Sequence, residues 1–311
     1  MKKVVIIGYG SAGRRHANIL IKYFDSSSIY VFTKQKIKKF KTFYKLNYIK
    51  NINPDYIVIA SETSKHFNQL KFLEKNFKNK KILVEKPLFH KDCDLKIKNN
   101  IVYINYNLRF HPLFSKLKDI IKKNKIYDIK FITNSFLPNW RKHKLNKKNY
   151  ALYKSKGGGV ILDLSHELDL IKNIYSKLEI KYIDFGKKSN ITSNSEDFLK
   201  LYGRHEQVNI SLDLSYYSRN EIRLILIDCK NSSFFIDLKN NIFKSSKVKK
   251  TLDYKKIYNQ NYTFSMVHKA IINGKDKNKL CNYNQAIKVM NFISLLKRSK
   301  KKFQFNNLKL L

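Results

Sequence analysis

Three titratable residues, Asp163, His166 and Asp169, recur at intervals of three within the run GGGVILDLSHELDLI. On a helix over residues 162–175, this spacing places all three side chains near one face. A carboxylate beside a histidine fixes the ring tautomer and raises its basicity, which suits a general base near neutral pH. A helix start and a surface ion pair are the alternatives, and the spacing leaves open whether Asp163 or Asp169 orients His166.

A second candidate is Lys86, in the triplet Glu85-Lys86-Pro87 that directly follows the run KILV. A lysine at the carboxyl end of a buried strand, beside a bound nicotinamide, can orient a substrate hydroxyl and stabilise alkoxide charge as hydride leaves. The alternative is an ordinary surface position, because Lys86 is one of 56 lysines (64 basic residues less 8 arginines).

The N-terminal stretch predicts the framework for this chemistry. Val4 to Ile7 form the short apolar run of a buried parallel strand, and three glycines follow in the spacing G-x-G-x-x-G before a helical pattern. Such glycines permit a tight turn, the approach of a pyrophosphate and close helix–strand packing, and the helix N-terminus favours phosphate. The alternative is a glycine-rich turn of another α/β protein. The predicted dinucleotide-binding turn comprises Gly8, Tyr9, Gly10, Ser11, Ala12 and Gly13.

The end of the second expected strand, residues 28–33, bears on the choice of cofactor. Units that prefer NAD hold the ribose 2′-hydroxyl with a carboxylate about 20 residues beyond the glycines. Thr33 and Lys34 stand at this place, followed by Gln35 and Lys36. Because a hydroxyl and ammonium groups favour a 2′-phosphate, we predict NADP in preference to NAD.

Five strand-like runs alternate with helical patterns over the first 107 residues. This alternation predicts a Rossmann domain with a doubly wound parallel sheet over residues 1–112. Such sheets bind ligands at the carboxyl ends of their strands. Polar residues that follow strand ends are therefore predicted to contact the dinucleotide, namely Ser61, Glu62, His66, Glu85, Lys86 and Asn107.

From about residue 126 the pattern changes to strand-like runs separated by short polar turns. Val208, Ile210, Leu212 and Leu214 alternate with polar neighbours, as in a sheet with one covered face. Helical patterns occur at 162–175, 262–273 and 284–297. We predict an α+β domain over residues 113–311 with a large, mainly antiparallel open sheet, and loops or strand edges near 141–149 and 244–256.

The formal charge of +41 has two explanations, a nucleic-acid surface or compositional drift. Lysine is spread along the whole chain and accompanied by abundant Asn, Ile, Tyr and Phe. A nucleic-acid interface concentrates charge and uses arginine for bidentate contacts. We therefore predict no specific nucleic-acid partner, although a basic surface still attracts anionic small molecules.

Cysteine usage and hydropathy bear on location. Three scattered cysteines, Cys93, Cys229 and Cys281, include no C-x-x-C pair, and no apolar run reaches the roughly 18 to 20 residues that span a bilayer. The four apolar residues after the N-terminal lysines are too few for a signal peptide. We expect a cytoplasmic protein with reduced thiols, no membrane partner and no metal site.

Jointly, these motifs resemble the Gfo/Idh/MocA family of NAD(P)-dependent oxidoreductases. The resemblance rests on the glycine turn with Arg15-His16, on Glu85-Lys86-Pro87, and on the triple glycine before Asp163 and His166, and it covers nearly all 311 residues. It implies hydride transfer at a CH–OH carbon of a sugar, cyclitol or nucleotide sugar, with Lys86 and His166 as the catalytic pair and Asp163 beside them. It also implies a homo-oligomer, a dimer or tetramer, through the C-terminal sheet.

The same resemblance makes Arg109, His111 and Trp140 candidates for binding the sugar, together with the catalytic residues. The sequence is most similar to members in surface-polysaccharide and sialic-acid-like sugar biosynthesis. It departs from the family in two respects: Asp163 and His166 are three residues apart rather than four, and the carboxylate after the second strand is missing. Two alternatives stay open: a dinucleotide-binding sensor or subunit without turnover, and an enzyme that uses NAD transiently for elimination or epimerisation.

Overall fold

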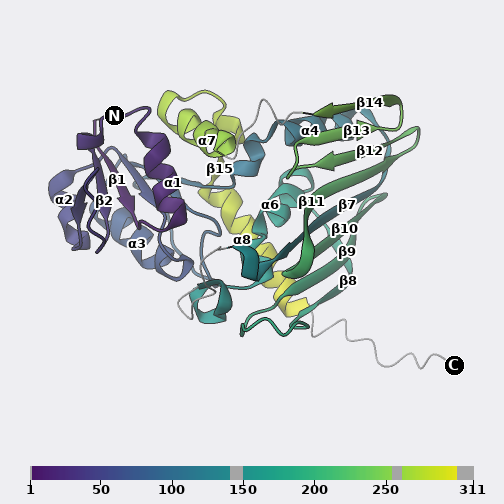
Figure 1. The fold of residues 1–311 in the computed structure, drawn as a ribbon, viewed down its shortest axis with the longest axis horizontal. Helices are drawn as coiled ribbons and strands as arrows, with labels where there is room; N and C mark the ends of the chain where they lie inside the picture. The colour runs from purple at the N-terminus through teal and green to yellow at the C-terminus, as the bar shows by residue number, and fades with distance from the viewer. Residues whose placement is uncertain (1, 141–149, 254–260, 300–311) are drawn as a thin grey trace. The chain divides into compact units, whose positions relative to one another are not determined.

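The computed structural model describes residues 2–140, 150–253 and 261–299, which divide into two compact units (Figure 1). The first unit comprises Met1–His111, Ser155–Gly157 and Asn259–Met290, and the second comprises Pro112–Lys154, Gly158–Tyr258 and Asn291–Leu311. Residues 259–290 thus complete the first unit, whereas the sequence suggested a single division between residues 112 and 113.

The first unit is built on a seven-stranded sheet of order β15-β6-β5-β4-β1-β2-β3. Every neighbouring pair from β6 to β3 is parallel, and only β15 at one edge is antiparallel. The predicted doubly wound parallel sheet is therefore confirmed. The strands are β1 (Val4–Ile7), β2 (Ile29–Phe32), β3 (Lys41–Phe43), β4 (Tyr56–Ile59), β5 (Lys81–Val84), β6 (Ile101–Ile104) and β15 (Cys281–Asn282).

Two helices from opposite ends of the sequence pack on one face of this sheet. All four residues of β1 and of β4 are fully buried, which is why their sequences are apolar without alternation. Ala17 of α1 (Ser11–Leu20) and Val267 of α7 (Tyr262–Asn273) share one apolar core with Val4 and Val58. Further helices are α2 (Ile49–Ile52), α3 (Thr63–Asn76) and α8 (Tyr283–Ser299), with a 3-10 turn, η3, at Asn107–Phe110.

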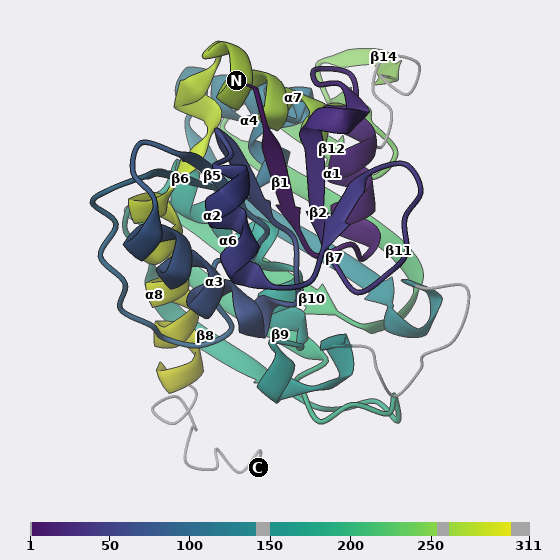
Figure 2. The ribbon, with the colours of Figure 1, turned by 90° about the vertical axis from the view of Figure 1, so that its left-hand side faces the viewer.

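The second unit is built on an eight-stranded sheet of order β14-β13-β12-β11-β7-β10-β9-β8. Only β7 and β10 run parallel to each other, so the predicted mainly antiparallel sheet is confirmed. Most strands of this sheet are labelled in Figure 1 and, after a turn of 90°, in Figure 2. The strands are β7 (Ile126–Phe136), β8 (Glu179–Gly186), β9 (Phe198–His205), β10 (Val208–Ser215), β11 (Tyr217–Cys229), β12 (Ser232–Asp237), β13 (Ile242–Ser245) and β14 (Val248–Asp253).

One face of this sheet is covered. Ile129 and Phe131 of β7 are buried, whereas Lys130 and Ile132 between and beyond them are partly exposed. The helices of the unit are α4 (Pro112–Lys123), α5 (Val160–Asp163) and α6 (Ser165–Ile174). Buried Glu167 of α6 accepts a hydrogen bond from Thr133 of β7 at 2.9 Å and pairs with Arg223 of β11 at 2.9 Å, which fixes α6 on the covered face.

The prediction of one helix over residues 162–175 was wrong. The backbone breaks at Leu164 (φ −97°, ψ 28°), between α5 and α6. The sequence VILDLSHELDLI contains neither glycine nor proline, so nothing in it predicts a helix break. The break adjoins Asp163, whose carboxylate is held by two tyrosines from outside the helix, so tertiary contacts override the local helical preference here.

The expected helices at 262–273 and 284–297 are present as α7 and α8, whereas the short strand β3 was not expected. The stretch near 244–256 contains β13 and the edge strand β14 up to Asp253, and residues 141–149 lie outside the described residues. None of the helices in the described ranges combines the length and apolar character needed to cross a membrane.

Candidate functional site

The turn between β1 and α1 has the form that a dinucleotide site requires. Gly8 has a φ of +100°, and a Cβ on it would lie 2.8 Å from backbone atoms of Ala60 and Ser61. A Cβ on Gly13 would lie 2.1 Å from the carbonyl oxygen of Gly8, so only glycine permits this approach of helix and strand. A Cβ on Gly10 would meet no described atom within 4 Å, which leaves room beside the turn for a pyrophosphate.

Helix α1 begins at Ser11, directly after this turn. Its N-cap residue is Gly10, which has no side chain that could cap the helix. The first turn of α1, all of which the structure describes, contains no acidic residue. The first N–H groups and the positive end of the helix dipole therefore suit a phosphate. The residues present fit the diphosphate of a dinucleotide.

The loop after β2 lies beside the same turn. The side-chain amide of Gln35 donates to the carbonyl oxygen of Tyr9 at 3.4 Å, and the backbone N–H of Gln35 donates to the Thr33 hydroxyl at 3.1 Å. Thr33 is itself fixed by its backbone N–H, which donates to the carbonyl oxygen of Phe43 at 2.9 Å. Thr33 and its neighbour Lys34 thus follow the strand end next to the glycine turn, as the sequence predicts.

His66 connects the turns that follow β4 and β5. Its buried ring nitrogens lie 3.1 Å from the carbonyl oxygen of Pro87 and 3.2 Å from that of Ser61, and burial lowers its pKa. The Ser61 hydroxyl donates to Gln69 at 2.7 Å. Glu62, in contrast, is half-exposed and forms a surface pair with a lysine one helical turn on. Both ring nitrogens of His66 thus contact backbone carbonyl oxygens of the protein itself.

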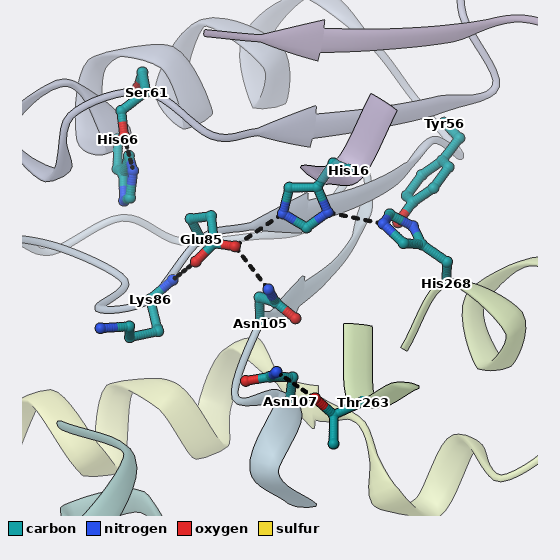
Figure 3. A network of polar contacts seen from close by, with 10 residues as sticks. All are labelled: His16, Tyr56, Ser61, His66, Glu85, Lys86, Asn105, Asn107, Thr263 and His268. Atoms are coloured by element: carbon teal, nitrogen blue, oxygen red, sulfur yellow. Dashed lines mark hydrogen bonds and ion pairs between the residues drawn. The ribbon is translucent and has the colours of Figure 1, made fainter. Parts of the chain in front are cut away.

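Glu85, at the carboxyl end of β5, accepts hydrogen bonds from two side chains and from the backbone (Figure 3). Its Oε1 accepts hydrogen bonds from His16 Nε2 at 2.8 Å and from Asn105 Nδ2 at 2.7 Å, and its Oε2 accepts one from the backbone N–H of Lys86 at 3.1 Å. Burial raises the pKa of this carboxyl, but the hydrogen bonds from His16 and Asn105 outweigh burial, so the pKa lies below its ordinary value. An ionised carboxylate thus directly precedes Lys86, whose bond to Pro87 is cis.

Two predicted site residues of the first unit hold its C-terminal segment. The Asn107 amide donates to Thr263 Oγ1 at 2.6 Å, and Arg109 Nη1 donates to Gln285 Oε1 at 2.7 Å. Asn107, Arg109 and the nearby candidate His111 are all buried. The contacts of Asn107 and Arg109 could not be predicted from the sequence, because their partners lie more than 150 residues away along the chain.

In the second unit, buried Asp163 is held by two phenols. The Tyr216 hydroxyl donates to Oδ2 at 2.6 Å, and the Tyr150 hydroxyl donates to Oδ1 at 3.0 Å. Burial, and then the charge of Asp163, raise the pKa of Tyr216 well above its usual value. Trp140 lies edge-on to Tyr216, with ring centroids 5.1 Å apart, so Trp140 and Asp163 both contact one tyrosine.

The break at Leu164 separates Asp163 from the two other members of its predicted triad. Half-buried His166 and buried Asp169 both belong to α6, three residues apart, whereas Asp163 ends α5. The proposed common helix face therefore applies to His166 and Asp169 only. No group of three or more His, Cys, Asp or Glu side chains in the described ranges is arranged to hold a metal ion.

The second unit also contains a cavity of about 870 Å³, which lies in the range of small-molecule sites. Its lining combines aromatic rings, hydroxyl and amide side chains, and one guanidinium. Among these residues are Phe136, Tyr153, Tyr217, Arg219 and the segment Ser189–Asn194. The segment is braced, since Asp197 accepts hydrogen bonds from the backbone of residues 188 and 189, and the Ser193 hydroxyl donates to the Leu152 carbonyl.

The motifs of the sequence did not predict this cavity. The run SNITSN, at residues 189–194, is rich in hydrogen-bonding side chains and was the one local signal for it. The Arg219 guanidinium lies 4.4 Å from the centre of the Phe136 ring, a contact that joins the start of β11 to the end of β7. Such cross-strand neighbours are set by sheet register, which the sequence alone does not reveal.

Comparison with known proteins identifies the first unit. Residues 2–96 match the model of the Gfo/Idh/MocA oxidoreductase family, which is described by its NAD-binding Rossmann fold. These residues form a Gfo/Idh/MocA Rossmann domain. The resemblance inferred from the motifs is thereby confirmed, and no curated protein matches the sequence.

Solved structures share the fold of this protein over nearly the whole chain. UDP-N-acetylglucosamine 3-dehydrogenase GnnA from Acidithiobacillus ferrooxidans is 14% identical, with a TM-score of 0.73, over 96% of this chain and 97% of that one. The WlbA dehydrogenase from Bordetella pertussis, in complex with NADH and UDP-GlcNAcA, is 12% identical, with a TM-score of 0.73, over 96% of each chain. GenD2 from gentamicin A biosynthesis, in complex with NAD, is 15% identical, with a TM-score of 0.74, over 97% and 95%.

Proposed function

We propose that the protein is an NAD(P)-dependent oxidoreductase that transfers a hydride between nicotinamide and a CH–OH or C=O carbon of a sugar, cyclitol or nucleotide sugar. One observation carries this proposal: the hydrogen bond from His16 to Glu85 ties the helix of the glycine turn to the residue before Lys86. A phosphate-binding turn and a lysine suited to proton transfer are thus parts of one hydrogen-bonded assembly in the Rossmann unit. Neighbours named for sugar-nucleotide dehydrogenation support the substrate class.

The dinucleotide site of this proposal uses the residues that follow the strand ends. The turn from Gly8 to Gly13 (Tyr9, Gly10, Ser11 and Ala12 included) holds the diphosphate, and Thr33 and Lys34 meet the adenosine ribose or its 2′-phosphate. NADP is preferred because no carboxylate stands at positions 33–36. Ser61, Glu62, His66, Glu85, Lys86 and Asn107 complete the proposed set for the nicotinamide half.

When bound, the nicotinamide supplies a two-electron hydride acceptor or donor. The protein's own residues position the substrate oxygen and exchange its proton. Lys86 orients the substrate oxygen and stabilises its negative charge, and His166 exchanges the proton that this oxygen loses or gains. Asp163 or Asp169 orients the His166 ring, and the Glu85 carboxylate holds the backbone N–H of Lys86.

The cavity of the second unit supports a carbohydrate with an anionic group. Hydroxyl and amide side chains of Ser189–Asn194 suit sugar hydroxyls, the rings of Phe136 and Tyr217 suit apolar sugar or base faces, and Arg219 suits a phosphate or carboxylate. We add these residues to the proposed sugar contacts Arg109, His111 and Trp140. An enzyme of surface-polysaccharide or sialic-acid-like sugar synthesis in the cytoplasm is the biological setting we propose.

A homo-oligomer through the outer face of the eight-stranded sheet belongs to the same proposal. Ile132, Leu224, Leu226 and Phe235 are partly exposed and neighbour one another across β7, β11 and β12. Light scattering is expected to report a dimer or tetramer, and Leu226→Lys is expected to shift it toward the monomer.

Titration with NADPH and NADH, followed by nicotinamide fluorescence, tests the cofactor site. We expect NADPH to bind more tightly. Gly10→Ala should weaken binding without lowering the thermal midpoint, because its Cβ meets only open space, whereas Gly13→Ala should lower both. If NADH binds more tightly, the choice of NADP is wrong but the rest of the proposal stands. If neither cofactor binds, the proposal is refuted.

Lys86→Ala separates an enzyme from a silent binding protein. We expect turnover of a reactive sugar nucleotide to fall by about 10³-fold or more, with NADPH affinity kept, whereas Lys78→Ala on an exposed position changes neither. Unchanged turnover in Lys86→Ala would exclude the proposed role. Product formation without net cofactor reduction or oxidation would instead identify transient use of NAD in elimination or epimerisation.

A further inference from the structure

Two buried histidines from opposite ends of the sequence connect the core of the Rossmann unit to Glu85. Tyr56 Oη lies 2.9 Å from His268 Nδ1, His268 Nε2 lies 2.8 Å from His16 Nδ1, and His16 Nε2 lies 2.8 Å from Glu85 Oε1 (Figure 3). Tyr56, His16 and His268 are fully buried and Glu85 is 9% exposed. We call these four residues the histidine bridge. It joins β4, α7, α1 and β5.

The protons of the histidine bridge can be assigned from its tyrosine end. Burial raises the pKa of Tyr56 well above its usual value, so the phenol keeps its proton. His268 Nδ1 is the single hydrogen-bond partner of the hydroxyl among the described residues, so the hydroxyl donates and His268 carries its own proton on Nε2. That proton is donated to His16 Nδ1, and His16 in turn donates from Nε2 to Glu85.

The carboxylate end requires the same direction. Glu85 accepts two further hydrogen bonds, from Asn105 and from the backbone N–H of Lys86, which suit an ionised carboxylate. The reverse direction needs a protonated Glu85 and leaves the Tyr56 hydroxyl proton buried without an acceptor. One arrangement of protons therefore satisfies every member, with both histidines neutral. Burial lowers the pKa of His268 well below its usual value, in agreement with a neutral His268.

We infer that His268, acting through His16, is a positioning residue that fixes the Glu85 carboxylate and with it the backbone of Lys86. This inference rests on the proposed function, in which Lys86 is catalytic. The charged and titratable groups around Glu85 are His16 from α1, Lys86 after β5, His66 from α3, and His268 from α7 behind His16. The fully buried bridge ends in the core at Tyr56, so it fixes a charge and an orientation and does not conduct protons to solvent.

Matched substitutions at position 268 separate hydrogen bonding from volume. His268→Gln keeps an amide N–H that can donate to His16, whereas His268→Leu removes donor and acceptor at similar size. In the His268→Leu variant, His16 Nδ1 has lost its donor, so the Glu85 carboxylate alone holds the His16 ring in place. Tyr56→Phe removes a single hydroxyl and leaves the ring, so it perturbs the fold least.

Tautomers can be read directly by nitrogen-15 NMR of the histidine-labelled full chain, which contains 8 histidines. We expect His16 and His268 both to carry the proton on Nε2. In His268→Leu, the His16 Nδ1 signal should move to the position of a ring nitrogen that accepts no hydrogen bond, and His268→Gln should restore the wild-type pattern. Tyr56→Phe should affect mainly the His268 signals.

Kinetics give the second measurement. Partners that orient a site residue typically contribute about 10- to 100-fold to activity, so His268→Leu should lower kcat by about 10-fold with little change in KM, and the Gln variant should recover most of it. A His16 Nδ1 signal that stays unchanged in a folded His268→Leu protein, with unchanged kcat, would overturn the inference. If His268→Leu does not fold, the same outcomes apply to Tyr56→Phe, read at His268. Wild-type protein that shows the NMR pattern but binds no dinucleotide would refute the proposed function and leave the bridge intact.

Discussion

Two buried carboxylates, Glu85 in the first unit and Asp163 in the second, are held in contrasting ways. Glu85 accepts hydrogen bonds from an imidazole, an amide and a backbone N–H, whereas Asp163 accepts from the phenols of Tyr150 and Tyr216. Behind the imidazole lies a second one, that of His268, whose pKa is lowered by burial. Of the two phenols, that of Tyr216 has a pKa raised well above its usual value, so it keeps its proton at neutral pH.

The largest expected effect comes from removing the two charges with isosteric amides. Glu85→Gln places an amide among three donors and leaves a buried group unpaired, so it should lower the free energy of unfolding by about 3 kcal/mol. Asp163→Asn keeps an acceptor for one tyrosine and should cost about 2 kcal/mol. Urea unfolding of both variants measures the difference. Equal losses of unfolding free energy would show that the two carboxylates are stabilised to the same extent, which would contradict the contrast drawn above.

The pH dependence of stability sharpens the contrast. Burial lowers the pKa of His268 and of His66, so the unfolded chain gains protons near pH 6.5 that the folded chain does not bind. The free energy of unfolding should therefore fall as pH drops below about 6.5, by about 1.4 kcal/mol per pH unit for each histidine. Tyr216, whose pKa is raised, contributes no change there, because its stabilisation is lost only above about pH 10.

Urea unfolding at pH 7.5, 6.5 and 5.5 measures this slope, with His268→Gln as the control. The variant should lose the part of the slope that belongs to one histidine. A slope unaffected by the substitution would mean that His268 takes up a proton in the folded protein, contrary to the assigned bridge.

A smaller effect is expected from the tyrosines of the second unit. Tyr216→Phe removes the 2.6 Å hydrogen bond to Asp163 and should cost about 2 kcal/mol, and Tyr150→Phe, whose bond is 3.0 Å long, should cost about 1 kcal/mol. Thermal unfolding compares the two variants. NADPH affinity, which is assigned to the first unit, should be unchanged in both, and a loss of affinity would contradict that assignment.

The smallest expected effect is that of Trp140→Leu. Trp140 is 37% exposed and touches Tyr216 edge-on, so the change should cost less than about 1 kcal/mol. If Trp140 binds sugar, KM for the substrate should nevertheless rise. An unchanged KM would remove Trp140 from the proposed sugar contacts.

The sequence was informative where one local pattern decides the structure. β1 and β4 are buried on both faces, so four consecutive apolar residues sufficed to predict each strand. β3, the segment KTF, was missed because Lys41 and Thr42 are exposed and only Phe43 is buried. The glycine spacing predicted the turn at Gly8 and Gly13 because steric limits there exclude every larger side chain.

Nothing in the sequence indicated contacts between residues that lie far apart along the chain. His16 and His268 are 252 residues apart, and nothing near either residue predicts their hydrogen bond. The helix break before Ser165 likewise depends on Tyr150 and Tyr216, which lie on other elements. Candidate residues could thus be named from motifs, but the groups that set their charge and orientation required the structure.

The return of residues 259–290 to the first unit has a consequence for synthesis on the ribosome. About 150 residues of the second unit separate His111 from Asn259, and at about 5–20 residues per second their translation takes roughly 10–30 s. During that interval the part of the face of β1 and β4 that later packs against Val267 and Ile271 stays uncovered beside α1, and His16 lacks its contact with His268. Until α7 emerges, the nascent Rossmann half therefore exposes apolar surface of the kind that makes incompletely folded chains prone to aggregation.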